Sequence, residues 1–442
     1  MHKMTHILRT ELPDSTQGTD SKEGHALFQV TISATVSHYY YSALAVHRAG
    51  LLNRYICGIA TSKQLTWLEP LIPTTIWNKL RSRIYMSLPH NRMKSIWWVE
   101  SMRLILEKGG LISGETGNLF NNYLHDLSAW CFVRGNGIFH FMSGVGLYSA
   151  KKAKRKGAVV VCDVRQEYPD FQFSMLEQES KLMGIEAQAS GKSYDRKIKM
   201  EFAIADYFIV PSDYAKKTFI QYGVYSDKIF VLPYGVSGLT VSGHSGINNN
   251  PSSYGKTFRL IYAGQIVLRK GIQYLIDGFN RLEVEDAELL LIGRIDKGMK
   301  GIIDKAMAEN QKIRTIGHLE KSELYKYFHA SSVFVLPTLA DSWGLVVLEA
   351  MSCGLPVIIT EHTGAKEAVS DGIDGFVVPI RDPTAITDRL RFLHDNVEER
   401  RRMGEAARKT ANKYTWDAYG DNLVKIYSEI MRRKEGMLEA CK

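Results

Sequence analysis

Two carboxylates stand at either end of one apolar stretch, TLADSWGLVVLEAMSCGLPVIIT, at residues 338–360. Asp341 precedes a Ser-Trp-Gly run, and Glu349 follows eight residues later between Leu348 and Ala350. Because burying an unpaired carboxylate is costly, Glu349 needs a partner from the protein or from a ligand. If both acids stood on one helix, they would lie about 12 Å apart on broadly one side of it. That separation suits an extended ligand with hydroxyl groups at both ends and a diphosphate between them.

A second segment, YAGQIVLRKGI, combines glycines with two cations. The pattern predicts that a strand ends at Gly264 and that a helix begins near Gly271, directly after Arg269 and Lys270. The free N–H groups of a helix start favour anions, and a neighbouring ammonium strengthens this preference. A loop with solvated cations is the plainer interpretation, and Asp341 could likewise only cap its helix.

Together the two segments fit a nucleotide sugar. Glu349 would bind the ribose diol, and Asp341 would contact the sugar. The N–H groups at the start of the helix would bind the phosphates through Ser342, Trp343, Gly344 and Leu345.

Apolar runs of strand length alternate with helical patterns along nearly the whole chain. The strands lack apolar–polar alternation, which is typical of parallel sheets covered on both faces. The predicted strands are 28–34, 54–60, 137–141, 158–164, 207–212, 228–234, 258–264, 287–293, 332–338 and 356–360. The segment 240–255 is rich in Gly, Ser and Asn, which is linker composition. These patterns predict an α/β protein with two Rossmann-like, doubly wound parallel-sheet domains, whose ligands bind where strands end and helices begin.

Composition argues against several other classes of protein. No stretch approaches the roughly 18 apolar residues that span a bilayer, and the N-terminus lacks the apolar core of a signal peptide. The five cysteines are scattered without CxxC spacing, which favours a cytoplasmic protein over a disulfide framework or a zinc site. Residues 1–240 carry 28 Lys and Arg against 20 Asp and Glu, whereas residues 241–442 carry 28 against 27. The basic first half indicates an anionic binding partner, such as phosphates, acidic glycans or a membrane face. Alternatively, its charge only keeps the protein soluble.

Residues 258–420 resemble the family 4 retaining glycosyltransferases of the GT-B fold. The resemblance runs through YAGQIVLRKGIQYLIDGF, LLLIG, IGHLEKSELYKYFHASSVFVLPT, the acid-pair stretch and TGAKEAVSDGIDGFVVP. The acid pair corresponds to the Glu-x7-Glu motif of the family. The first half is similar more loosely, through residues 204–236, 37–52 and 137–147. The last of these carries His140, which corresponds to a histidine near the reacting sugar, although a lone histidine at a strand end is often structural.

The resemblance implies an enzyme that moves a sugar from a nucleotide donor with retention at the anomeric carbon, without a metal or a cofactor. Lys270, with Gln265 and Arg269 nearby, would bind the diphosphate. Asp341 and His140 would position the sugar. The nucleotide base would be held largely by backbone near Gly293, Gly317 and His318, and Gly264 would also bind the donor.

Two residues depart from the family pattern. Asp341 stands where the family has Glu, so its reach toward a sugar hydroxyl is shorter by one methylene. Gln265 stands where the family has the Arg of an Arg-x4-Lys phosphate clamp, and Arg269 is a candidate to compensate. Two alternatives stay open beside the transferase: a nucleotide-sugar epimerase or phosphorylase-like enzyme, and a non-catalytic nucleotide-sugar-binding subunit.

The resemblance also gives the expected domain organisation. The acceptor, a glycan or a lipid-linked molecule in polysaccharide or glycoconjugate biosynthesis, would bind the N-terminal domain. The basic run KKAKRK at 151–156 and the pair Trp97–Trp98 are compatible with contact to an anionic membrane at its inner face. The expected units are a polar leader of disordered type at 1–24, an acceptor domain at 25–239, the linker at 240–255, a donor domain at 256–414 and a helix at 415–442 that packs back onto the N-terminal domain.

Overall fold

The structure is a computed structural model of the 442-residue chain. It describes residues 28–36, 38–58, 88–112, 114–185, 192–236 and 257–440. The predicted leader at 1–24 and the predicted linker at 240–255 lie outside the described residues.

The N-terminal domain is built on a seven-stranded sheet of order β3-β2-β1-β4-β5-β6-β7. Every neighbouring pair in it is parallel. The central strands β1, β4 and β5 are buried along their whole length, as expected for a sheet covered on both faces. The strands are β1 Val30–Ala34, β2 Leu52–Cys57, β3 Met93–Ser95, β4 Ile138–Met142, β5 Val159–Asp163, β6 Tyr207–Val210 and β7 Ile229–Val231.

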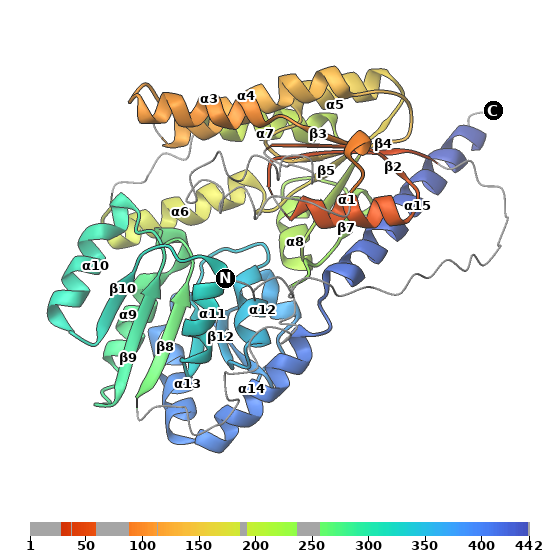
Figure 1. Ribbon diagram of the computed structural model, residues 1–442. Coiled ribbons are helices and arrows are strands. Elements are labelled where there is room, and N and C mark those ends of the chain that lie inside the picture. Colours follow the sequence, from red (N-terminus) through yellow and green to blue (C-terminus); the bar gives the residue numbers. More distant parts are fainter. Residues whose placement is uncertain are drawn as a thin grey trace, which may run out of the picture.

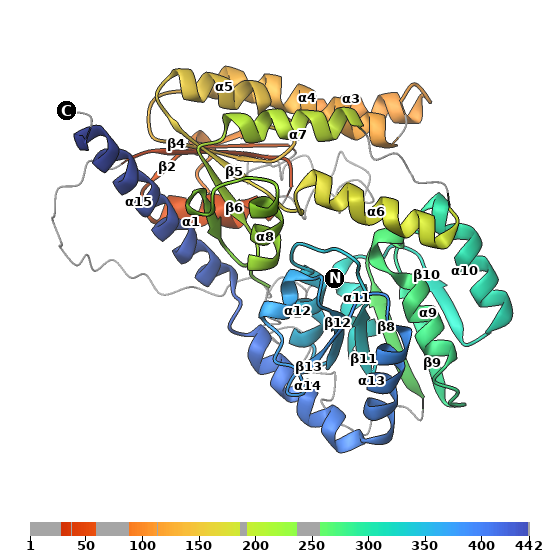
Figure 2. The ribbon, with the colours of Figure 1, turned by 180° about the vertical axis from the view of Figure 1, so that it is seen from behind.

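Helices cover both faces of this sheet, with α3, α4, α5 and α7 on one side and α1, α8 and the last helix of the chain on the other (Figure 1). Helix α6 instead extends toward the second domain (Figure 2). The helices are α1 Tyr39–Arg48, α3 Trp97–Lys108, α4 Gly114–Phe132, α5 Leu147–Arg155, α6 Pro169–Met183, α7 Lys192–Ile204 and α8 Asp213–Gln221.

The C-terminal domain has a six-stranded sheet of order β10-β9-β8-β11-β12-β13, again parallel throughout. Its strands are β8 Phe258–Ala263, β9 Ala287–Ile292, β10 Ile313–Ile316, β11 Val333–Leu336, β12 Val357–Thr360 and β13 Gly375–Val378. Its helices are α9 Ile272–Asn280, α10 Lys297–Glu309, α11 Lys321–His329, α12 Leu345–Ser352, α13 Pro383–Asp395 and α14 Val397–Ala411. The predicted class, two doubly wound parallel-sheet domains, is therefore confirmed.

All ten strands that the sequence predicts are present, most of them shorter by one to three residues. Three further strands were not predicted, and all of them lie at sheet edges: β3, β10 and β13. Edge strands are short and only partly buried: β3 reads MKS and β10 reads IRTI. Their apolar runs are too brief to separate from loops by pattern.

The last helix, α15 Trp416–Ala440, returns to the N-terminal domain and packs on α1, as the sequence predicts. Tyr419 of α15 hydrogen-bonds Ser42 of α1 at 3.0 Å. Where the chain returns, the amide of Val236 donates to Tyr414 O at 2.8 Å. A Cβ on Gly235 would lie 2.5 Å from the backbone of Thr415 and Trp416, so this close approach needs glycine.

Candidate functional site

Tight glycine turns end the central strands of the C-terminal sheet. Gly264 follows β8 and Gly293 follows β9, each with φ of +148°, a conformation that favours glycine. A Cβ on Gly293 would lie 1.8 Å from Gly264 O, so the two turns pack backbone to backbone. Gly317 and His318 follow β10 at the same edge and are exposed. Because the sheet is parallel, all four predicted residues share the carboxyl edge, where α/β proteins bind ligands.

Lys270 ends a short 3-10 helix, Leu268–Lys270, between β8 and α9. The next residue, Gly271, has φ of +65°, and a Cβ there would lie 2.0 Å from Pro337 O. The ammonium of Lys270 forms an ion pair with the carboxylate of Asp341. Burial lowers the pKa of Lys270, and Asp341 opposes that shift in part. The structure therefore brings together the cation and the first acid of the pair.

Asp341 also caps the start of α12. Its Oδ1 accepts a hydrogen bond from the amide of Gly344 at 3.0 Å and lies 3.4 Å from the amide of Trp343. Burial alone would raise the pKa of Asp341, but the charges of Lys270 and Arg269 outweigh it and hold the pKa below its ordinary value. The carboxylate thus stays ionised between a cation and a helix start.

The two acids do not stand on one helix. Helix α12 begins at Leu345, and Gly344 before it has φ of +76°. Asp341 lies outside the helix, in an isolated bridge to Thr363. The 12 Å separation of a shared helix therefore does not apply, because the chain turns between the two acids.

Arg269 is tied to the loop after β11. Its guanidinium donates to Ala340 O, and its own carbonyl accepts from the amide of Leu339 at 2.9 Å. The hydroxyl of Thr338 lies 3.2 Å from the same carbonyl. These contacts fix the backbone beside Lys270 and engage one nitrogen of the Arg269 guanidinium.

Glu349 has a protein partner that the sequence did not reveal. Its Oε1 lies 2.7 Å from Nζ of Lys321 at the start of α11, with Glu349 13% and Lys321 49% exposed. Burial alone would lower the pKa of Lys321, but the Glu349 carboxylate outweighs it and raises that pKa. The need for a partner was predicted, whereas its identity depends on how α11 packs beside α12.

His140 lies in the core of the N-terminal domain. It is fully buried in β4, with Nδ1 2.8 Å from the hydroxyl of Tyr427 in α15 and Nε2 3.3 Å from Oδ2 of Asp163. These contacts fit a structural role, and its predicted contact with a sugar stays a prediction.

Ser342 connects the two domains, whereas Trp343 packs within the C-terminal domain. The hydroxyl of Ser342 donates to Arg165 O at 2.5 Å, and its carbonyl accepts from the hydroxyl of Ser212 at 2.6 Å. Trp343 is 2% exposed, and its ring lies 5.8 Å from that of Tyr414. The contacts of Ser342 therefore hold the start of α12 against the N-terminal domain.

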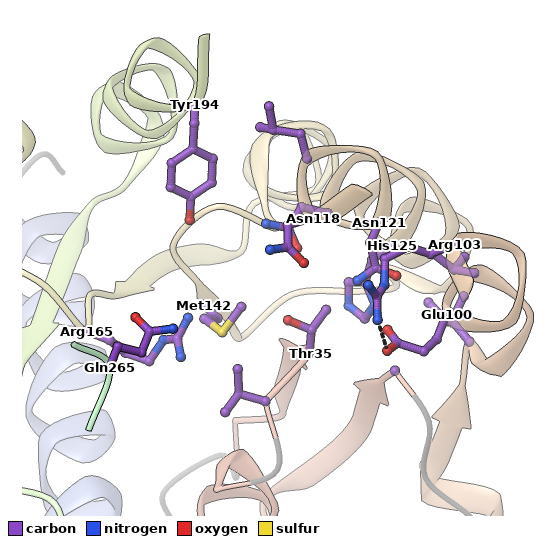
Figure 3. A pocket seen from close by; sticks show the side chains of 16 residues that line it. Thr35, Glu100, Arg103, Asn118, Asn121, His125, Met142, Arg165, Tyr194 and Gln265 are labelled. Atoms are coloured by element: carbon purple, nitrogen blue, oxygen red, sulfur yellow. Dashed lines mark hydrogen bonds and ion pairs between the residues drawn. The ribbon is translucent and has the colours of Figure 1, made fainter. Parts of the chain in front are cut away.

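A cavity of about 800 Å³ lies at the carboxyl edge of the N-terminal sheet. Gln265 reaches it from the other domain, and Figure 3 shows its side chain together with those of Arg165 and Met142. Helix α4 contributes the amides of Asn118, Asn121 and Asn122. Within the described part of the chain, no three His, Cys, Asp or Glu side chains group as metal ligands would.

Two parallel-sheet domains, joined by a returning C-terminal helix and with the candidate site where they meet, define the GT-B architecture. HepE of Anabaena in complex with UDP has this fold, with a TM-score of 0.59 and 13% identity over 91% of this chain and 100% of that one. A glycosyltransferase from Rickettsia africae is similar, with a TM-score of 0.57 and 16% identity over 92% of this chain and 99% of that one.

Residues 247–410 match the family model described as glycosyl transferases group 1. A D-inositol 3-phosphate glycosyltransferase of Paenarthrobacter aurescens is 29% identical over 47% of this chain and 53% of its own length. The capsular polysaccharide biosynthesis glycosyltransferase CapM of Staphylococcus aureus is 30% identical over 48% of this chain and 58% of its own. The chain thus spans about half the length of these curated relatives. The finer assignment to family 4 stays a prediction.

Proposed function

We propose that the protein is a glycosyltransferase that moves a sugar from a nucleotide-sugar donor to a glycan or lipid-linked acceptor, with retention of configuration. The observation that carries this proposal is the anion site at the start of α12. The ammonium of Lys270 and the amide of Gly344 both point at one carboxylate, that of Asp341. A diphosphate is likewise negatively charged and presents acceptor oxygens to these donors.

In the proposed reaction, the bond between the anomeric carbon and the donor phosphate oxygen breaks while the acceptor oxygen bonds to that carbon. Negative charge builds on the leaving diphosphate, where fixed donors such as Lys270 and the start of α12 stabilise it. The leaving phosphate oxygen takes the proton of the acceptor hydroxyl on the same face. No metal or cofactor takes part, and Glu349 holds the ribose.

The amides that line the cavity support a hydroxylated acceptor. Asn118, Asn121 and Asn122 carry donors and acceptors without charge, which suits the hydroxyl groups of a saccharide. The names of relatives such as CapM agree with a role in polysaccharide or glycoconjugate biosynthesis.

Thermal-shift screening against uridine, guanosine and adenosine diphosphate sugars tests this proposal. A donor at 100 times its dissociation constant should stabilise the protein by about 2.7 kcal/mol. The bound donor is then incubated with and without saccharide acceptors, and the products are analysed by mass spectrometry and NMR. Transfer with retention supports the proposal, whereas epimerisation of the free donor, or binding without turnover, contradicts it.

We further propose that the N-terminal domain contacts an anionic membrane at the inner face. No helix in the described residues is long and apolar enough to cross a bilayer. Instead, α3, α4 and the basic helix α5 lie together on one side of the N-terminal sheet (Figure 1). This face exposes Trp97, Trp98, Ile105, Leu127 and Trp130. Nζ of Lys152 in α5 lies 4.0 Å from the ring centroid of Trp130, which joins the apolar and basic parts of the surface.

Co-sedimentation with vesicles checks the membrane proposal. We expect binding to phosphatidylglycerol vesicles that weakens with salt, because surface charges are screened, and little binding to neutral vesicles. The double variant Trp97→Ser/Trp98→Ser should lose this binding, whereas Tyr225→Ser, which changes a more exposed aromatic residue elsewhere, should not. Absence of binding at low salt would sink the idea.

A further inference from the structure

One arginine that lines the cavity forms no ion pair with any residue that the structure describes. Two arginines line it, Arg103 and Arg165. Arg103 is neutralised by Glu100 and Glu107, each at 2.7 Å. Among the residues that the structure describes, Arg165 has no ion pair, and its buried Nε has no hydrogen-bond partner. His125 adds no charge at neutral pH, since burial and Lys197 lower its pKa to about 3.

Arg165 lies on the loop between β5 and α6, which is held against the donor domain. Its carbonyl accepts the hydrogen bond from Ser342, the residue that follows Asp341. Two residues later, Glu167 is 1% exposed. Burial raises the pKa of Glu167, whereas the charges of Arg269 and Lys270 lower it. The loop therefore reaches the vicinity of the anion site from the opposite domain.

Gln265 of the C-terminal domain lies at the same end of the cavity as Arg165. Figure 3 shows the side chains of Gln265 and Arg165 at the end near Met142, away from Arg103. The side-chain amide of Gln265 offers two N–H donors but no charge. The neighbouring cation from its own domain, Arg269, already donates to Ala340 O. Of Arg103, Arg165 and Arg269, Arg165 is thus the one that faces this end of the cavity with an unused N–H donor.

We propose that Arg165 binds the donor diphosphate from the N-terminal domain and so supplies the guanidinium that position 265 lacks. This inference rests on the proposed function and deepens it. A guanidinium offers paired N–H donors that match phosphate oxygens. Lys270 and the start of α12 would hold the diphosphate from one domain while Arg165 closes on it from the other. Donor binding would thereby depend on the relative position of the domains.

Isothermal titration with UDP, GDP and ADP, without acceptor, tests the role of Arg165. We expect Arg165→Gln to weaken the nucleoside diphosphate that the wild type binds by about 10- to 100-fold, as for a lost charge-assisted hydrogen bond. Arg134→Gln removes the same charge from an exposed position of the same domain and should leave the affinity unchanged. Thermal unfolding checks that each variant is folded.

A rescue variant separates phosphate binding from a structural role. Arg165→Gln/Gln265→Arg returns a guanidinium to the same end of the cavity and should recover at least part of the lost affinity. An unchanged affinity in Arg165→Gln would overturn the inference, even if transfer to the acceptor falls, because Arg165 would then bind the acceptor instead. Loss in Arg165→Gln without recovery in the double variant would also contradict it. If the wild type binds none of the three nucleotides, the proposed function itself fails.

Discussion

At the scale of residues, the two acids meet different kinds of partner. Asp341 both caps α12 and pairs with Lys270. The two interpretations of Asp341, as a helix cap and as part of a ligand site, therefore do not exclude each other. Glu349 pairs with Lys321, which is 28 positions away on another helix. Local sequence predicted that a carboxylate amid apolar residues needs a partner. It could not predict which one, since that depends on the packing of two helices.

Replacing Glu349 with Gln tests whether it also binds the donor. If Glu349 holds the ribose, Glu349→Gln should weaken nucleoside diphosphate binding by about 1.5–3 kcal/mol, because a charge-assisted hydrogen bond is lost. Lys321→Gln breaks the same ion pair but leaves the carboxylate, so the affinity of this variant for the nucleoside diphosphate should change far less. Titration calorimetry compares the two variants. Equal affinities in wild type and Glu349→Gln would show that the acid only pairs with Lys321.

His125 gives the unfolding free energy a defined dependence on pH. It is buried in α4, and burial, with the charge of Lys197, lowers its pKa from an ordinary 6.5 to about 3. Between these values the unfolded chain binds a proton that the folded chain does not, so stability falls as the pH falls from 6.5. Glu201 has the opposite effect, because burial raises its pKa to about 7. Its contribution to the unfolding free energy is complete below the ordinary pKa of 4.5 and is lost as the pH rises toward 7.

Comparison with His125→Gln isolates the histidine from Glu201. The unfolding free energy of the wild type, relative to that of the variant, should decrease by on the order of 3 kcal/mol between pH 6.5 and pH 4. Urea unfolding at several pH values measures this difference. A difference that stays constant over that range would mean that His125 is protonated in the folded protein.

At the scale of elements, pattern alone predicted the central strands and missed three at the sheet edges. Central strands such as β5 and β11 are continuous apolar runs, because helices cover both of their faces. The loops that carry the site were predictable as strand-to-helix junctions with glycines. The backbone contacts of these loops were not predictable, because Gly293 and Gly264 approach each other only when β8 and β9 pair.

Gly293→Ala should disrupt the carboxyl edge of the C-terminal sheet. Its φ of +148° is strained for alanine, and the new Cβ would overlap Gly264 O, which is backbone and cannot swing away. We expect a loss of more than about 2 kcal/mol in unfolding free energy. Gly301→Ala, inside α10 with open space around it, should instead stabilise by up to about 1 kcal/mol. Urea unfolding of the two variants checks the contrast.

At the scale of the whole molecule, the sequence predicted two domains and a returning helix but not the contacts that set their relative position. Those contacts join residues far apart in the chain, as Ser212 and Ser342 do. Glu367 accepts from the amides of Asp213 and Tyr214 at 3.0 and 2.8 Å and so caps a helix of the other domain. No local pattern signals such pairs, because each partner is ordinary in its own segment.

One of these inter-domain contacts is a hydrogen-bond cluster around Glu179, and its removal should loosen the domains. Glu179 in α6 is fully buried and accepts from Gln273 and Tyr274 of α9 at 2.8 Å each, and from Arg381 at 2.7 Å. Glu179→Gln removes the charge and turns an N–H₂ group toward donors. Arg381 is 23% exposed, so water recovers part of the loss. We expect a decrease of about 1.5–3 kcal/mol in unfolding free energy and a larger radius of gyration.

A matched control lies on the same helix. Glu177 pairs with Lys181 at 3.0 Å on the surface, with side chains 45% and 74% exposed, and such a pair contributes about 0.3–0.5 kcal/mol. Glu177→Gln should therefore leave both the urea midpoint and the small-angle scattering profile near those of the wild type. If Glu179→Gln behaves like this control, the buried carboxylate does not hold the domains. If it loosens them, nucleotide binding should weaken as well, because a phosphate held by Lys270 and Arg165 requires both domains in place.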